Sequence, residues 1–478
     1  MNGDQPPNPK ASGPAAAAAV GADLVIRAKR VVTPAGIVEA EVHIRDGVII
    51  AVTGAADRTA AGAGPRSVGT AAGVGWVSPH GAGVIELPDD EVLMPGLVDT
   101  HVHINEPGRT DWEGFTTATA AAAAGGITTL IDMPLNSIPP TTSVAALAAK
   151  QRAAAGKCAV DVGFWAGAVP ANAADRRGLH EAGVFGFKCF LVDSGVPEFP
   201  PLDDEELTTA LRQVAELGSL LVVHAEDPAH LAPPSGGSYP EFLRSRPAAA
   251  ETAAVARLIG GARASGTRVH VLHLSAAEAV PLLAAAQADG VAITAETCPH
   301  YLALAAEDIR PGQTQFKCCP PIRKAANRER LWAGVADGVV GCVVSDHSPC
   351  PPELKGLGAA DFASAWGGIS SVQLGLPVVW TQAAERGYEL ADVARWMAAS
   401  PAKLAGLADK GSITAGYAAD LVAFAPDEEF VVEPDRLRTR HRLTPYLGRR
   451  LRGVVRRTWL RGEPVTEGQP AGRLLWRP

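Results

Sequence analysis

The sequence has no apolar run long enough to cross a membrane and no surplus of basic residues. A bilayer-spanning helix needs about 20 consecutive apolar residues, and no stretch of the 478 residues approaches that length. The formal net charge is -8, and no basic stripe interrupts it, which argues against binding to a nucleic-acid backbone. We therefore expect a protein that binds neither membranes nor nucleic acid.

Cysteine is scarce, and the first residues do not have the pattern of a secretion signal. The seven cysteines are odd in number, and their spacing fits neither a zinc ribbon nor a small disulfide scaffold. Residues 1–21 are rich in Pro, Ala and Gly and lack a basic start before an apolar segment, so we expect a disordered tail. A reducing cytoplasm is the expected setting.

The two ends of the chain share one pattern. Apolar and polar residues alternate around an Asp46-Gly47 turn, which predicts short antiparallel strands. Similar strand patterns return near the end, in residues 419–424 and 454–462. We predict one small β-sandwich domain built from both ends, with residues 22–91 as its first part and 411–478 as its second. Within the first part, residues 53–83 are Gly/Ala-rich without a period and are predicted to be a loop insertion.

Between residues 92 and 410, short buried strands alternate with helices rich in Ala and Leu. The hydrophobic fraction of 47% is sufficient for a large core here. The alternation predicts an α/β fold of the TIM-like (β/α)8 barrel type. We expect this barrel to be the catalytic domain. Its eight strands are expected at residues 94–103, 128–133, 161–169, 185–192, 220–225, 268–274, 292–298 and 342–345. In such a barrel the carboxyl ends of all strands converge on one face.

His101 and His103 lie where the first of these strands ends. Side chains two residues apart on a strand point to the same side, so both imidazoles can approach one metal ion. The ends of later strands carry four more candidate ligands: Lys188, His224, His273 and Asp346. His224 or His273 alone could equally be a satisfied core histidine. Together, the four imidazoles and one carboxylate suit zinc, cobalt, nickel, manganese or iron, without deciding among them.

Lys188 is the exception among these residues, because it is a cation that follows an apolar run. One reading is an ion pair with Asp193 or Glu226. The other is a lysine whose pKa is lowered by burial, which leaves a neutral, reactive amine. Such an amine can take up carbon dioxide and become a carbamate, N6-carboxylysine, which is anionic and can bridge two cations.

Several longer motifs resemble the cyclic-amidohydrolase superfamily, and within it most closely the allantoinases. The resemblance covers nearly the whole chain and is most specific in residues 94–108, 186–191, 316–323, 345–352 and 365–370. It implies two divalent metal ions, expected to be zinc. His101 and His103 would bind one with Asp346, His224 and His273 would bind the other, and carboxylated Lys188 would bridge them. It also implies a homo-oligomer, often a tetramer.

The resemblance implies a reaction as well: the hydantoin ring of allantoin opens to give allantoate, a step in purine degradation. Bound cations lower the pKa of water and polarise a ring carbonyl. Asp346 would be the catalytic acid and base, taking a proton from the attacking water and delivering it to the departing ring nitrogen.

Two positions favour allantoin over other rings. Asn105 stands where dihydroorotases typically carry an arginine for a substrate carboxylate, and no tyrosine closely follows Lys188, as hydantoinases and dihydropyrimidinases would have. The candidate contacts to the substrate are Asn136, Cys319, Ser348 and the backbone of Gly367 and Gly368. The alternatives are a hydantoinase or dihydropyrimidinase that acts on another cyclic amide, and a non-catalytic scaffold with the same fold.

Overall fold

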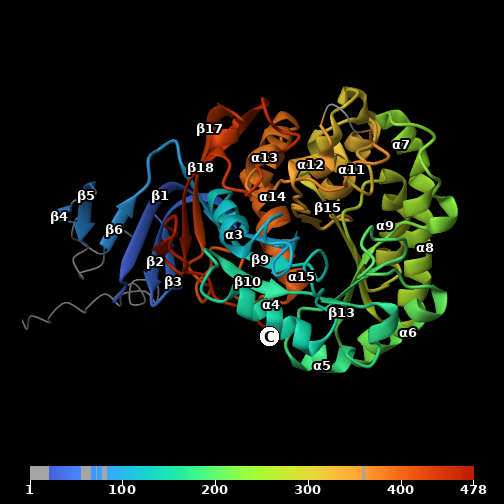
Figure 1. The fold of residues 1–478 in the computed structure, drawn as a ribbon. Helices are drawn as coiled ribbons and strands as arrows, with labels where there is room; N and C mark the ends of the chain where they lie inside the picture. Colours follow the sequence, from blue (N-terminus) through green and yellow to red (C-terminus); the bar gives the residue numbers. More distant parts are fainter. Residues whose placement is uncertain (1–20, 55–65, 71–72, 78–82, 358–360) are drawn as a thin grey trace, which may run out of the picture.

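The computed structural model describes residues 21–54, 66–70, 73–77, 83–357 and 361–478. Strands from the two ends of the chain lie together on one side of the molecule, and a barrel wrapped by helices lies on the other (Figure 1). The predicted tail, residues 1–21, falls outside the described residues except for Gly21. Among the described residues, no helix is both long and apolar enough to span a membrane.

The terminal strands form one connected sheet that joins both ends of the chain. β1 pairs with β2, β6 and β7, while β17 pairs with β7 and β18. The strands of this sheet are β1 (Leu24–Thr33), β2 (Gly36–Arg45), β3 (Val48–Gly54), β4 (Arg66–Thr70), β5 (Gly73–Val77), β6 (Gly83–Glu86), β7 (Val92–Pro95), β17 (Leu421–Val431), β18 (Arg450–Leu460) and β19 (Glu463–Pro464). The predicted turn joins β2 to β3, with φ of 51° at Asp46 and 78° at Gly47, the positive values that a two-residue hairpin loop favours.

Part of the expected loop insertion is a hairpin instead. β4 and β5 pair antiparallel, and β5 continues the pairing onto β6. The prediction of an unstructured insertion over residues 53–83 is therefore wrong for these segments, while residues 55–65, 71–72 and 78–82 lie outside the described part. The backbone hydrogen bonds of a sheet edge can recruit a segment whose side chains show no strand period, so composition alone misses it.

Eight parallel strands form the barrel. They are β8 (Leu97–Val102), β9 (Ile127–Asp132), β10 (Asp161–Phe164) with its continuation β11 (Ala166–Gly167), β12 (Phe187–Phe190), β13 (Leu220–His224), β14 (Arg268–Val271), β15 (Ile293–Thr297) and β16 (Cys342–Val343). A parallel bridge between Val102 and His347 brings the end of the last strand beside the first. Nearly all residues of these strands are buried, as expected when helices cover the outer face.

The helices follow the strands in the order that the sequence predicts. They are α3 (Phe115–Ala124), α4 (Val144–Ala154), α5 (Arg176–Glu181), α6 (Asp204–Glu216), α7 (Tyr239–Ser245), α8 (Ala248–Ser265), α9 (Val280–Ala288), α10 (Pro299–Ala303), α11 (Ala325–Ala336), α12 (Pro352–Lys355), α13 (Gly375–Glu385), α14 (Leu390–Ala394) and α15 (Ser400–Ala405). Several begin at a side-chain cap; at α6, for example, Asp203 and Glu206 bond to each other's backbone N–H groups at 2.8 and 2.9 Å.

The strand predicted over residues 94–103 is in fact two strands in two sheets. β7 pairs with β17 in the terminal sheet, whereas β8 pairs with β9 in the barrel. Gly96 separates them, and its N–H donates to the carbonyl of Asp420. A Cβ at this position would lie 2.3 Å from the Thr128 hydroxyl oxygen, so the close approach of the two sheets requires glycine. The division of the chain at residues 91 and 410 stays a prediction.

Candidate metal centre

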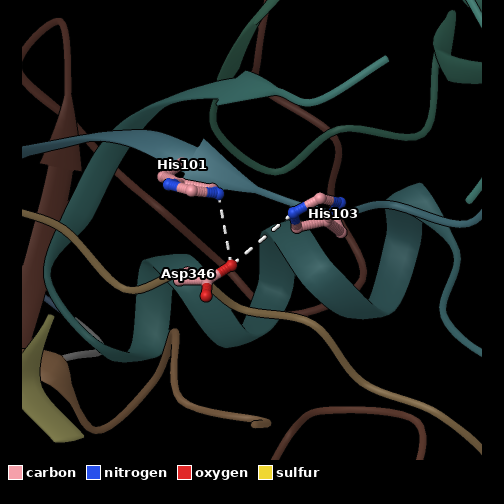
Figure 2. A group of neighbouring side chains, drawn as sticks. All are labelled: His101, His103 and Asp346. Atoms are coloured by element: carbon pink, nitrogen blue, oxygen red, sulfur yellow. Dashed lines mark ion pairs between the residues drawn. The ribbon is translucent and has the colours of Figure 1, made fainter. Parts of the chain in front are cut away.

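His101, His103 and Asp346 meet at the carboxyl ends of two barrel strands. His101 is in β8, His103 follows it, and Asp346 lies three residues after β16. The Nε2 atoms of His101 and His103 lie 3.2 and 3.6 Å from Asp346 Oδ1 (Figure 2). All three side chains are buried, and a metal ion between them would have two nitrogen ligands and one oxygen ligand. We call these three residues the carboxylate half of the site.

Electrostatics keep these residues in the forms that bind metal. Burial lowers the pKa of His103 to about 4, so its imidazole is neutral. Burial alone would raise the pKa of Asp346, but the imidazoles around it, His101 first, hold this pKa well below its usual value. His103 and Asp346 are therefore in the neutral and ionised forms, respectively, that bind a cation.

Lys188, His224 and His273 come together on the neighbouring strands β12, β13 and the end of β14. His224 Nδ1 and His273 Nε2 are 3.0 Å apart. Two nitrogens bound to one zinc ion at about 2.1 Å lie about 3.4 Å apart at a tetrahedral angle, so this spacing is close to that of a shared metal. The Lys188 ammonium lies 4.3 Å from the centre of the Phe190 ring, and burial lowers its pKa to about 8. We call these three residues the lysine half.

The two halves are adjacent. The ring centroid of His101, in the carboxylate half, lies 5.3 Å from that of His273, in the lysine half. This is as close as the 5.4 Å that separates His101 from His103 within the carboxylate half. His101 Nε2 is buried and has no hydrogen-bond partner among the described residues, although it faces Asp346. Buried polar atoms normally have a partner, so this orphaned nitrogen fits a missing metal ion. The structure thus brings together all six residues that the sequence marks as ligands.

Backbone strain is also concentrated here. His273 and Asp346 have φ of 35° and 43°, and the predicted substrate contact Asn136 has φ of 71°. Positive φ is unfavourable for residues with a Cβ and is often found at functional sites. The three residues lie two to four positions after the barrel strands β14, β16 and β9, where the chain turns at the cavity.

A carboxylate that the sequence did not point out supports His101. His101 Nδ1 lies 2.5 Å from Glu296 Oε1, and the other Glu296 oxygen lies 3.0 Å from His270 Nε2. Burial would raise the pKa of Glu296, but the two histidines outweigh it and lower the pKa to about 2. An ionised carboxylate only accepts hydrogen bonds, so Nδ1 of His101 carries a proton and Nε2 is the nitrogen directed toward Asp346 and a metal.

A second carboxylate, that of Glu226, supports the imidazole ring of His224. His224 Nε2 lies 2.7 Å from Glu226 Oε2, and the Arg246 guanidinium grips Glu226 through two bonds of 3.0 and 2.6 Å. Glu226 is buried, yet His224 and Arg246 together lower its pKa to about 2. His224 Nδ1 is thereby left free to face His273. Both carboxylates carry a sequence signal, because each is an acidic residue within or just after a buried strand, as Asp346 is.

The site opens into a cavity of about 460 Å³. Lys188, four other residues of the site and every predicted substrate contact line it: His103, His224, His273, Asp346, Asn136, Cys319, Ser348, Gly367 and Gly368. The Ser348 hydroxyl donates to Asp346 Oδ1 at 2.9 Å. Asn105 is fully buried and is not among the residues that line this cavity.

Comparisons with known proteins identify the family of this chain. The model of the amidohydrolase family matches residues 92–465. An allantoinase of Streptomyces avermitilis is 54% identical over 95% of this chain and 99% of its own length, and that of Saccharomyces cerevisiae is 48% identical over 78% and 82%.

Solved structures with a similar fold include an L-hydantoinase (dihydropyrimidinase) from Arthrobacter aurescens. It has a TM-score of 0.85 and 29% identity, and the match covers 95% of this chain and 100% of that one. A dihydropyrimidinase from Brevibacillus agri has a TM-score of 0.81 and 26% identity, over 95% and 98% of the two chains. Sequence and fold lead to the same group of enzymes: the chain belongs to the amidohydrolase family and, within it, to the allantoinases.

Proposed function

We propose that this protein hydrolyses a ring amide of allantoin and releases allantoate, using two divalent metal ions. One observation carries the proposal. Six ligand-type side chains converge at the carboxyl ends of the barrel strands, and the lining of the cavity above them includes the neutral polar groups of Asn136, Cys319 and Ser348. Allantoin carries no carboxylate but has a polar ureido arm, which such a lining suits.

In this proposal His101, His103 and Asp346 hold one ion, and His224 and His273 hold the other. Zinc is the metal expected first, with cobalt, manganese, nickel and iron as alternatives. The cations supply activation of water and polarisation of the ring carbonyl. Lys188 would take up carbon dioxide: its neutral amine would form an N–C bond to the carbon as one C=O π bond opens, and the nitrogen would release a proton to solvent. The resulting anionic carbamate could serve as a ligand for both ions.

Asp346 moves the proton in this proposal. Its ionised carboxylate accepts the proton of the attacking water and donates it to the ring nitrogen as the amide bond breaks. Ser348 holds the carboxylate in place through the bond to Oδ1. Glu296 and Glu226 fix the ring orientations of His101 and His224, so the positions of both ions depend on them.

The substrate would be held by Asn136, Cys319, Ser348 and the backbone at Gly368, all of which border the cavity. These groups offer neutral donors and acceptors for the ureido arm and for the ring amide that does not react. We further propose a homotetramer in the cytoplasm, without nucleic-acid or membrane partners. Light scattering during size-exclusion chromatography tests the tetramer, and a monomeric mass would contradict it.

The function is tested by hydrolysis of allantoin beside hydantoin, dihydrouracil and dihydroorotate, with protein loaded with zinc, cobalt or manganese. We expect a strong preference for allantoin and loss of activity after chelation. Activity on hydantoin or dihydrouracil alone would keep the chemistry but replace the substrate. No turnover of any ring, with two equivalents of metal bound, would mean a scaffold instead of an enzyme.

A further inference from the structure

One wall of the cavity is a segment without regular secondary structure. Residues 364–368 line the cavity, and residues 363–368 belong to no helix or strand. The carbonyl groups of such a segment need partners from elsewhere, because no ladder or helix supplies them. Two lysine side chains are those partners.

Lys355, the last residue of α12, is buried and donates to three carbonyl oxygens. Its Nζ lies 2.8 Å from Trp366 O, 2.5 Å from Gly368 O and 3.2 Å from Lys317 O. An ammonium has three N–H donors, so these contacts use all of them. Burial lowers the pKa of this lysine to about 8.

Lys317 holds the other half of the segment. Its Nζ donates to Ala363 O at 3.0 Å and to Ala365 O at 2.6 Å, and it lies 5.2 Å from the centre of the Phe242 ring. The carbonyl of Lys317 accepts both the Lys355 ammonium and the N–H of Gly368, the latter at 2.9 Å. The two lysines and the segment therefore form one connected set of hydrogen bonds.

These lysines have no acidic partner in the part of the chain that the structure describes: no carboxylate oxygen lies within ion-pair distance of either Nζ. A buried cation without an anion is costly, and an apolar side chain would fill the same space more cheaply. Instead, both ammonium groups donate hydrogen bonds to backbone carbonyl oxygens of a cavity wall. This cost points to a role in the site beyond core packing.

The contacts leave the backbone N–H and C=O of one residue of the wall without a partner among the described residues. The carbonyls of Trp366 and Gly368 are taken by Lys355, whereas neither the N–H nor the C=O of Gly367 has a hydrogen-bond partner among the described residues. Gly367 lines the cavity and has no side chain to cover its backbone. The residue offers one backbone donor and one backbone acceptor, the complement of an amide edge with a C=O and an N–H.

We propose that Lys317 and Lys355 are positioning residues that hold residues 363–368 so that the backbone N–H and C=O of Gly367 pair with an amide edge of the substrate. They touch neither the reacting atoms nor the metal ligands. The inference rests on the proposed function, since it assumes a cyclic amide in this cavity. It assigns a part in substrate affinity to two lysines outside the ligand set, of which Lys317 itself borders the cavity.

The test is Lys355→Met, with Lys317→Met as a second variant and the exposed Lys324→Met as the matched control. For Lys355→Met we expect KM for allantoin to rise about 10- to 100-fold, kcat to change less than about threefold and metal content to stay at the wild-type value. Lys317→Met removes two bonds instead of three and should raise KM less. Amide hydrogen exchange in a peptide covering residues 361–369 should accelerate in both variants and stay unchanged in Lys324→Met.

An unchanged KM in a folded variant with faster exchange in this peptide would overturn the proposal, and so would a fall in kcat with loss of metal. If Lys355→Met does not fold, the same criteria apply to Lys317→Met. Failure of the proposed function is a separate result: wild-type protein would then turn over no allantoin. In that case KM is measured with the cyclic amide that the wild-type protein does hydrolyse. A rise in KM for that substrate still supports the positioning role.

Discussion

The carboxylate half and the lysine half of the site have the same number of residues but opposite charge. In the first, two imidazoles face Asp346, whose pKa is held well below its usual value. In the second, two imidazoles lie beside the amine of Lys188. A divalent cation is attracted to a carboxylate and repelled by an ammonium at this distance. The first half can therefore bind metal as folded, whereas the second needs its lysine converted to an anion.

The largest effect should come from the carboxylate half. Asp346→Asn removes the anion and the proton carrier together, so we expect kcat to fall by at least about 1,000-fold with the fold intact. Turnover of allantoin, metal content and circular dichroism measure the three properties. The exposed Asp289→Asn is the matched control. Near-normal turnover by Asp346→Asn would remove this residue from proton transfer.

The lysine half should respond differently. Lys188→Ala leaves His224 and His273 without an anionic bridge, so we expect bound metal to fall from two ions to one and activity to fall by about 100-fold or more. Short carboxylic acids such as propionate should restore part of the activity, because they fit the space that the side chain leaves. Lys188→Arg keeps the positive charge and fills that space, and should not be rescued. Two ions retained in Lys188→Ala would contradict the bridging role.

The comparison also separates what the sequence could predict from what it could not. The six ligand positions follow from one rule, since each lies at the end of an apolar run in an alternating strand–helix pattern, and such ends converge in a barrel. Glu296 also lies in a buried strand, but its role could not be predicted because it depends on a contact with His101, 195 positions away, that no periodicity encodes.

The division of the predicted strand at Gly96 and the contacts of the two lysines could not be predicted from the sequence for the same reason. The break is set by the Asp420 carbonyl and the side chain of Thr128, both remote in sequence. The bonds from Lys355 go to backbone atoms, and a sequence does not show which carbonyl groups lack a partner. Local patterns therefore predict where ligands lie, while the groups that orient them emerge only once distant segments pack.

The smallest effects should come from the carboxylates behind the histidines, and they should still distinguish the two halves. Glu296→Gln and Glu226→Gln each replace the charged acceptor that fixes a ligand ring by a neutral amide, so we expect each to weaken metal binding by about 10- to 100-fold. Titration with zinc after chelation measures both affinities. Glu296→Gln should weaken the ion held by His101, and Glu226→Gln the ion held by His224. The exposed Glu278→Gln serves as the control.

Stability should separate the same two variants. Glu226 is the partner of the Arg246 guanidinium, which is mostly buried, with a side-chain exposure of 19%. Glu226→Gln leaves that permanent cation unpaired, and removal of one member of a buried ion pair costs about 3–5 kcal/mol. The partners of Glu296 are histidines, which can lose their proton, so Glu296→Gln should lower the free energy of unfolding by only about 1–3 kcal/mol. Equal losses in urea unfolding of the two metal-free variants would show that Arg246 does not depend on Glu226.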